Sequence, residues 1–178
     1  WLYDAVSNAI KQIGKDKPAQ TLLYAKLSPD GKKAAYVQAN NIYVEDLATG
    51  KSTVLTSTNN TKKLINGTFD WVYEEEFGFS RAFCWSPDSR NLAFYRFDES
   101  HVKQFDMTVF QGLYPLVTRF KYPKAGESNS IVSIHVYGLE TGKTTTMNTG
   151  SETDQYIPRI KWSNTPGKLC IIRLNRLQ

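Results

Sequence analysis

Three features of the sequence predict an all-β protein. Short apolar stretches alternate with polar residues at the period of strands, and turn-forming residues separate them. Aromatic residues, which suit pleated surfaces, make up 13% of the chain. A strand–turn–strand pattern also recurs, once around Ser28-Pro29-Asp30-Gly31, once around Ser86-Pro87-Asp88-Ser89 and in a degenerate form around Ser163. Such repeats are typical of a protein assembled from similar small antiparallel sheets.

The first repeat can be followed strand by strand. Residues 1–5 predict a strand, and residues 6–20 predict a strand end and a loop. Residues 24–37 enter the Ser-Pro-Asp-Gly turn as one strand and leave it as the next. Proline presets one backbone angle of this turn, and glycine accepts the positive φ that follows. Residues 41–47 and 52–55 give the third and fourth strands, which a turn at residues 48–51 connects.

The later copies define the repeating unit. Residues 81–95 and 157–172 repeat the first strand pair, and residues 134–143 repeat residues 42–51 down to the Thr-Gly-Lys turn. The unit is therefore four antiparallel strands, and repeated units of this kind are the blades of a β-propeller. The copies are spaced more widely than a blade of roughly 40–50 residues requires, which predicts insertions around residues 59–80 and 105–126.

The number of copies predicts a partial β-propeller. The chain holds about three four-stranded antiparallel blades or parts of them, with only about two complete. A propeller ring closes with at least four blades. We therefore expect a fragment of a larger propeller, with a short helical acidic segment in its first insertion.

The acidic segment is Asp70-Trp71-Val72-Tyr73-Glu74-Glu75-Glu76-Phe77. We expect its acids to be partly buried, because aromatic residues flank them on both sides. Neighbouring carboxylates repel each other and burial adds a desolvation cost, which an arriving cation offsets. Two carboxylates can each accept a charge-assisted hydrogen bond from one ammonium group. The segment therefore predicts a receptor for a positively charged group, and the alternative is a solvated turn of helix without a ligand.

Composition excludes several function classes. The net charge is +5, but the basic residues are scattered and form no stripe with aromatic residues between them, so nucleic acid is not an expected partner. No apolar run approaches the roughly 20 residues that span a bilayer. Cys84 and Cys170 each lie in an apolar strand pattern, which favours buried free thiols over a disulfide. No metal-ligand spacing is present, and neither a metal nor a cofactor is expected.

One known family has the same motifs in the same order and spacing, namely residues 70–77, Trp85-Ser86-Pro87, Leu92-Ala93-Phe94 and Tyr122-Pro123-Lys124-Ala125-Gly126. From about Ser28 to Lys143 the sequence resembles the propeller domain of dipeptidyl peptidase IV and its prolyl oligopeptidase relatives. The resemblance implies that residues 1–178 are a fragment of the N-terminal β-propeller domain, from an eight-bladed parent. We expect a bacterial origin.

The resemblance also implies an activity. The family joins its propeller to an α/β-hydrolase domain and removes dipeptides, or in some relatives tripeptides, after proline or alanine. The last two acids of its motif, here Glu75 and Glu76, hold the free amino terminus of the substrate, and Glu74 is structural. The catalytic serine, aspartate and histidine belong to the hydrolase domain. This chain has no Gly-x-Ser-x-Gly elbow, so we expect no catalytic residue in it and no activity of the fragment alone.

The expected partners follow from the same resemblance. They are the amino terminus of a peptide substrate, the hydrolase domain of the full-length protein and a second copy of the chain, joined through residues 105–126. Exposed apolar hairpins such as this one usually have partners. The family implies a periplasmic, cell-surface or secreted location, and it places a further substrate-contacting arginine upstream of residue 1. The alternatives are a non-enzymatic β-propeller that binds or scaffolds other proteins and a structural adhesion module, because the turn repeat alone identifies only a fold.

Overall fold

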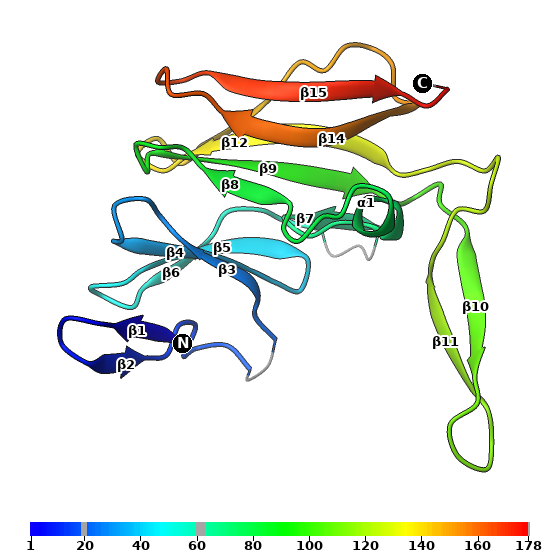
Figure 1. The fold of residues 1–178 in the computed structure, drawn as a ribbon, viewed down its shortest axis with the longest axis horizontal. Coiled ribbons are helices and arrows are strands. Elements are labelled where there is room, and N and C mark those ends of the chain that lie inside the picture. Colours follow the sequence, from blue (N-terminus) through cyan, green and yellow to red (C-terminus); the bar gives the residue numbers. More distant parts are fainter. Residues whose placement is uncertain (19–20, 60–62, 178) are drawn as a thin grey trace.

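A computed structural model of the chain describes residues 1–18, 21–59 and 63–177 and shows an all-β protein built from several small antiparallel sheets (Figure 1). The N-terminal hairpin pairs β1 (Leu2–Asp4) with β2 (Ala9–Lys11). Strand β2 corrects the prediction of a strand end and loop over residues 6–20. Three residues are too short a run to show a strand period, and β2 forms because β1 lies beside it.

The first predicted four-stranded unit is confirmed. Its strands form one antiparallel sheet in chain order, β3 (Leu23–Leu27), β4 (Lys33–Gln38), β5 (Asn41–Asp46) and β6 (Ser52–Val54). Strand β4 is buried along nearly its whole length. It can be buried because the neighbouring sheets cover both of its faces, and this explains why its sequence is mostly apolar.

The second unit has one strand more than predicted. Four of its strands match the repeat, β8 (Phe83–Trp85), β9 (Asn91–Asp98), β12 (Ile131–Gly138) and β13 (Lys143–Thr146). The fifth, β7 (Leu64–Asn66), comes from the first insertion and pairs with residues 96–98 of β9, whereas β8 pairs with residues 92–94. Strand β9 is long enough to hold two short partners along one edge, so the insertion extends the sheet.

The remaining elements are a strand pair that packs on this sheet, a hairpin and a short helix. Strands β14 (Gln155–Trp162) and β15 (Leu169–Asn175) pair with each other, and β14 contacts β8 and β12. The predicted hairpin of the second insertion is confirmed as β10 (Gln104–Val109) and β11 (Leu116–Lys121), which extends away from the sheets (Figure 1). The first insertion contains the short helix α1 (Trp71–Glu75), which confirms a helical acidic segment.

The Ser-Pro-Asp turns repeat in atomic detail. In the first turn the hydroxyl of Ser28 donates to Asp30 Oδ1 at 2.6 Å and accepts from the backbone N–H of Lys33 at 3.0 Å. In the second, Ser86 donates to Asp88 Oδ1 at 2.5 Å and accepts from the N–H of Asn91 at 2.8 Å. The serine therefore closes the turn between two strands through its side chain, which is a local effect that sequence can predict.

A second repeated contact joins neighbouring sheets. The indole N–H of Trp85 on β8 donates to the carbonyl oxygen of Lys26 on β3 at 3.2 Å. The indole N–H of Trp162 on β14 donates to the carbonyl oxygen of Cys84 on β8, also at 3.2 Å. Each tryptophan directly precedes the serine of its turn, and each acceptor lies two residues before the serine of the previous turn. The first strands of the three repeats, β3, β8 and β14, are therefore joined by equivalent hydrogen bonds, one between each neighbouring pair.

The hydrophobic core is divided among the gaps between sheets. One cluster, with Ile13 and Tyr36, joins the N-terminal segment to the β3–β6 sheet. A second, with Val37 and Phe94, lies between that sheet and the five-stranded sheet. A third, with Tyr73, joins the five-stranded sheet to α1 and β14. Each sheet is thus stabilised mainly by burial against its neighbours.

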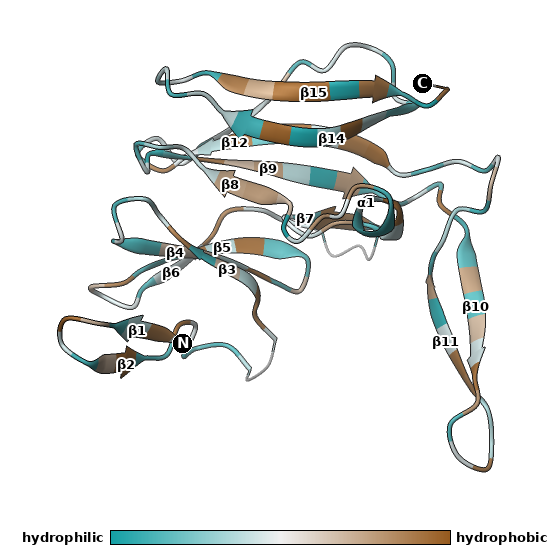
Figure 2. Ribbon diagram, in the orientation of Figure 1, coloured by the Kyte–Doolittle hydropathy of each residue, from teal (hydrophilic) through white to brown (hydrophobic). Residues whose placement is uncertain are grey.

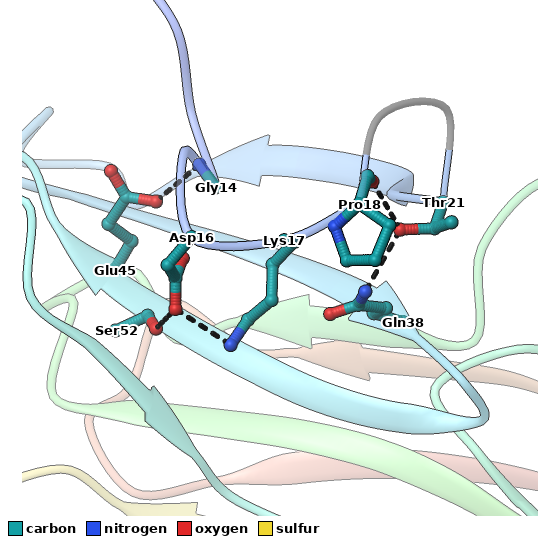
Figure 3. Close-up of polar contacts among 8 residues, drawn as sticks. All are labelled: Gly14, Asp16, Lys17, Pro18, Thr21, Gln38, Glu45 and Ser52. Carbon is teal, nitrogen blue, oxygen red and sulfur yellow. Dashed lines mark hydrogen bonds and ion pairs between the residues drawn. The ribbon is translucent and has the colours of Figure 1, made fainter.

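Polar contacts hold the N-terminal segment on the β3–β6 sheet (Figure 3). The buried carboxylate of Glu45 accepts from the backbone N–H of Gly14 at 2.7 Å. Asp16 accepts from the Ser52 hydroxyl at 3.1 Å and forms an ion pair with Lys17. These contacts fix the path of the chain from the N-terminal hairpin to β3.

Candidate functional site

Helix α1 begins at a buried carboxylate. Asp70 is the N-cap residue, and its Oδ1 accepts from the backbone N–H of Tyr73 at 3.0 Å. Its Oδ2 accepts from the hydroxyl of Ser130 at 2.5 Å. An N-cap acid satisfies a backbone donor that a helix leaves free, which is why aspartate is favoured there. Burial raises the pKa of Asp70, and the hydrogen bonds oppose that rise.

Tyr73 anchors the middle of the helix. Its ring is 2% exposed and contacts Phe77, Phe79 and Phe97 with ring centroids about 5 Å apart. Its hydroxyl accepts from the backbone N–H of Ile157 on β14 at 2.8 Å. Burial raises the pKa of Tyr73, so the hydroxyl stays neutral. The short helix is therefore held at its start by Asp70 and on its inner side by a contact to a distant strand.

The acids that follow are not buried. Val72 and Tyr73 point into the core, whereas Glu74, Glu75 and Glu76 are all exposed. The prediction of partial burial is wrong, and the buried acid of the segment is Asp70. A helix of five residues has one inward side, and the apolar residues occupy it. The flanking aromatic residues bury themselves without burying the glutamates.

The glutamates are nevertheless available to a ligand. Within residues 1–18, 21–59 and 63–177, no hydrogen bond or ion pair engages the carboxylate of Glu74, Glu75 or Glu76. Their backbone is ordered by the helix, since Glu76 N–H donates to Val72 O at 2.9 Å and Gly78 N–H donates to Glu74 O at 3.1 Å. The segment therefore presents free carboxylates on a fixed backbone.

A pocket of about 430 Å³ opens beside Glu76. The root of the β10–β11 hairpin forms one wall with Tyr122 and Lys124, and Tyr156 of β14 contributes to another. The rings of Trp71 and Tyr122 meet edge to face with centroids 4.4 Å apart. The structure thus brings the acidic motif together with the Tyr122–Gly126 motif, which lies far from it in sequence.

The two cysteines match the prediction only in part. Cys84 and Cys170 are both free, but Cys84 is half-buried and Cys170 is exposed, so the expectation that both are buried is wrong. Burial raises the pKa of Cys84 to about 11. The described parts of the chain contain no group of three or more His, Cys, Asp or Glu residues that could hold a metal ion. They also contain no helix long and apolar enough to cross a membrane.

Sequence reasoning missed the residues that hold the site. Ser130 lies 60 residues from Asp70, and Ile157 lies 84 residues from Tyr73. A serine and a backbone N–H carry no signal of such contacts in a single sequence. The one available signal was Asp70 itself, because aspartate is a favoured N-cap residue directly before the first residue of a helix.

Comparison with known proteins gives this architecture a family. A sequence profile described as "Dipeptidyl peptidase IV (DPP IV) N-terminal region" matches residues 1–178. This chain belongs to that family. The resemblance in the acidic and Tyr-Pro-Lys-Ala-Gly motifs is therefore confirmed as a family relationship.

Individual relatives agree with this assignment. "Probable dipeptidyl-aminopeptidase B" of Talaromyces marneffei is 31% identical over 99% of this chain and 21% of its own length. "Inactive dipeptidyl peptidase 10" of Mus musculus is 36% identical over 88% of this chain and 20% of its own length. The crystal structure of Porphyromonas gingivalis dipeptidyl peptidase 4 matches with a TM-score of 0.90 and 37% identity, over 99% of this chain and 25% of that chain.

The chain covers only part of the length of each relative named here. It spans about a fifth of the curated relatives named here and a quarter of the matched crystal structure. Its several small antiparallel sheets correspond to part of the N-terminal β-propeller region of the dipeptidyl peptidase IV family. The all-β prediction agrees with this finding.

Proposed function

We propose that this chain is the part of a serine dipeptidyl or tripeptidyl aminopeptidase that recognises the free amino terminus of a peptide cleaved after proline or alanine. The observation that carries the proposal is the pair Glu75 and Glu76, two adjacent exposed carboxylates at the end of an anchored helix. Relatives named as dipeptidyl aminopeptidases support the reaction class. The propeller is a fragment of an eight-bladed ring, and the α/β-hydrolase domain of the full-length protein supplies the catalytic triad.

The geometry of the helix suits an ammonium group. Neighbouring side chains on a helix leave its axis about 100° apart, so Glu75 and Glu76 can approach one cation from two sides. An ammonium group has three donors and no acceptor, and each carboxylate can accept one charge-assisted hydrogen bond from it. Asp70 and Tyr73 hold the backbone before the ligand arrives, which lowers the entropy lost on binding.

A fixed receptor also sets the cleavage position. When the amino terminus of a peptide is bound at Glu75 and Glu76, only the bond at a set distance from it reaches the catalytic serine. The enzyme therefore releases a short N-terminal piece from each peptide. The bulk of the ring limits access to substrates that can reach the site end first.

Charge removal at the acidic pair tests this proposal in the full-length protein. We expect Glu75→Gln or Glu76→Gln to lower kcat/KM and raise KM for a free peptide. A lost ammonium–carboxylate contact of about 1.5–3 kcal/mol corresponds to a decrease of roughly 10- to 150-fold. Steady-state kinetics on a Gly-Pro chromogenic substrate measures the effect.

Two controls make the test specific. Glu74→Gln removes the same charge one residue earlier and should change kcat/KM little. A substrate with an acetylated amino terminus lacks the ammonium group, and the wild-type protein should cleave it as poorly as the variants cleave the free peptide. Equal cleavage of acetylated and free peptides would contradict the proposal.

A non-enzymatic binding propeller is the second candidate. The mouse relative named as an inactive dipeptidyl peptidase, 36% identical to this chain, supports it because this region occurs in a protein described as lacking the activity. A segment downstream with Gly-x-Ser-x-Gly, together with hydrolysis of the chromogenic dipeptide, distinguishes the enzyme from the binding module.

A further inference from the structure

A second pocket lies between β8 and β14. Part of its wall is the stretch of residues 78–81, which directly follows the acidic segment in sequence. Its volume is about 230 Å³, and its walls include Ser80, Arg81, Tyr95 and Arg159. Phe79, Phe83 and Ile160 supply apolar surface. No acidic residue lines it among the residues that the structure describes. The pocket therefore has the opposite charge to the glutamate motif that precedes it.

Both arginines are held in place by contacts that leave donors free. Arg81 donates through Nε to the carbonyl oxygen of Phe83 at 3.0 Å, and its guanidinium carbon lies 5.6 Å from the centroid of the Phe83 ring. Arg159 donates through Nη1 to the carbonyl oxygen of Pro158 at 2.6 Å, and its guanidinium carbon lies 5.7 Å from the centroid of the Phe79 ring. These contacts use one donor of each guanidinium, which carries five.

Neither guanidinium has a carboxylate partner in the part of the chain that the structure describes. Two cationic groups lining one pocket repel each other unless an anion lies between them. The Cys84 thiol does not supply a negative charge between the arginines. Burial raises its pKa to about 11, so the thiol is neutral at physiological pH.

One residue of the pocket wall, Tyr95, has a buried hydroxyl without a partner. Tyr95 is 2% exposed, and its hydroxyl forms no hydrogen bond with the described residues. A buried polar group that is left unpaired costs about 1–3 kcal/mol. Unpaired groups of this kind are rare in native structures and mark places where strain or a ligand explains them.

From these observations we infer that the pocket between β8 and β14 binds a carboxylate group of a peptide, through Arg81 and Arg159. Guanidinium groups match the planar geometry of a carboxylate and bind it through parallel hydrogen bonds. The volume holds a carboxylate with a short carbon chain, and the apolar walls contact that chain. The inference rests on the proposed function for the identity of the ligand as a peptide.

The location of the pocket connects it to the amino-terminus receptor. Arg81 lies five residues after Glu76, and five residues span at most about 18 Å even when fully extended. A peptide bound by its ammonium group at Glu75 and Glu76 can therefore carry a carboxylate within reach of the pocket. That carboxylate belongs either to an aspartate or glutamate side chain near the amino terminus or to the carboxyl end of a short peptide.

Matched peptide pairs on the full-length protein distinguish the two sources. The first pair is an Asp-Pro and an Asn-Pro chromogenic substrate, and the second is Gly-Pro-Ala as free acid and as amide. We expect the charged member of one pair to have a kcat/KM at least about tenfold higher, as a charge-assisted hydrogen bond provides. Calorimetric dissociation constants for uncleaved Asp-Gly and Asn-Gly, and for Gly-Gly-Gly as free acid and as amide, give the same two comparisons without catalysis.

Variants assign the preference to the pocket. Arg159→Gln should reduce the charged-to-neutral ratio to about 1, and Arg81→Gln should reduce it in the same way. Arg90→Gln removes an equal charge from the β8–β9 turn, where Arg90 pairs with Glu140 on the surface, and should keep the wild-type ratio. A ratio near 1 for both wild-type pairs would overturn the inference, as would equal ratios for Arg159→Gln and Arg90→Gln. Neither outcome would change the effect of amino-terminal acetylation, which is the test of the proposed function.

Discussion

Asp70 and Glu76 show how differently acids of one motif are used. Asp70 is buried and caps the helix, whereas Glu76 is exposed beside a pocket. The sequence places them six residues apart with aromatic residues between them, and this pattern predicted burial for the wrong members. The side of a short helix that faces the core decides which side chains are buried. A single run of acidic residues does not reveal which side that is.

His135 predicts a dependence of stability on pH. It is 5% exposed, its ring stacks on Phe94, and its nitrogens contact the hydroxyls of Ser133 and Thr146. Burial, and next the charge of Arg96, lower its pKa from 6.5 to about 4. The unfolded chain therefore binds a proton before the folded one does. The stabilising contribution is present above pH 6.5 and is lost as the pH falls toward 4.

Two measurements check this expectation in the full-length protein. Nuclear magnetic resonance of the His135 ring should show titration near pH 4, and the free energy of unfolding should decrease between pH 6.5 and 4. His135→Gln removes the titrating group and should flatten that decrease. His101→Gln, a change at an exposed turn residue, should not. Titration of His135 near 6.5 would show that the ring is hydrated in the folded protein.

At the scale of elements, the β10–β11 hairpin is the part least explained by the fold of this chain. Apolar residues at its far end are exposed, with Phe110 83%, Leu113 97% and Tyr114 83% accessible. Figure 2 shows hydrophobic residues at this end, away from the other sheets. The hairpin is paired in register from Gln104 with Lys121 to Val109 with Leu116, so it projects as a regular two-stranded arm.

We propose that this arm joins two copies of the full-length protein, and charge at its tip tests the proposal. Phe110→Asp with Leu113→Asp places two acids on the apolar surface, and we expect sedimentation velocity to show monomers where the wild type shows dimers. The desolvation of buried carboxylates in the interface opposes association. Val6→Asp changes an equally exposed apolar residue on the N-terminal hairpin and should leave the dimer intact. A wild-type monomer, or an unchanged double variant, would contradict this role.

At the scale of the whole molecule, the sheets depend on each other. The hydrophobic clusters lie between sheets, and strands β3, β8 and β14 are connected by the same tryptophan contact. A sheet removed from the middle of this series loses its buried faces on both sides. The matched crystal structure contains the same arrangement over 99% of this chain, as a TM-score of 0.90 requires.

Removing one of the tryptophan hydrogen bonds tests this dependence. Trp85→Phe keeps an aromatic ring but removes the donor to Lys26 O and leaves a small void, so we expect a loss of about 1–2 kcal/mol in local stability. Hydrogen exchange in the full-length protein should become faster in both β3 and β8. Trp1→Phe, at a residue that is 82% exposed, is the matched control. Faster exchange confined to β8 would show that the contact does not couple the two sheets.

Patterns of neighbouring residues in the sequence were enough to predict the repeated unit and the family. The Ser-Pro-Asp turns, the strand periods and both insertions depend on residues close together in the chain, so a single sequence displays them. The acidic motif is also local, and the family resemblance singled out Glu75 and Glu76 within it.

Packing across the chain was needed for the rest. The burial of Asp70 depends on Ser130, the position of α1 depends on Ile157, and the extra strand β7 depends on the free half of β9. The arginine pocket likewise combines Arg81, from the segment before β8, with Arg159 of β14. Contacts between residues 60 to 84 positions apart arise from the way the sheets stack, and they leave no pattern in the local order of residues.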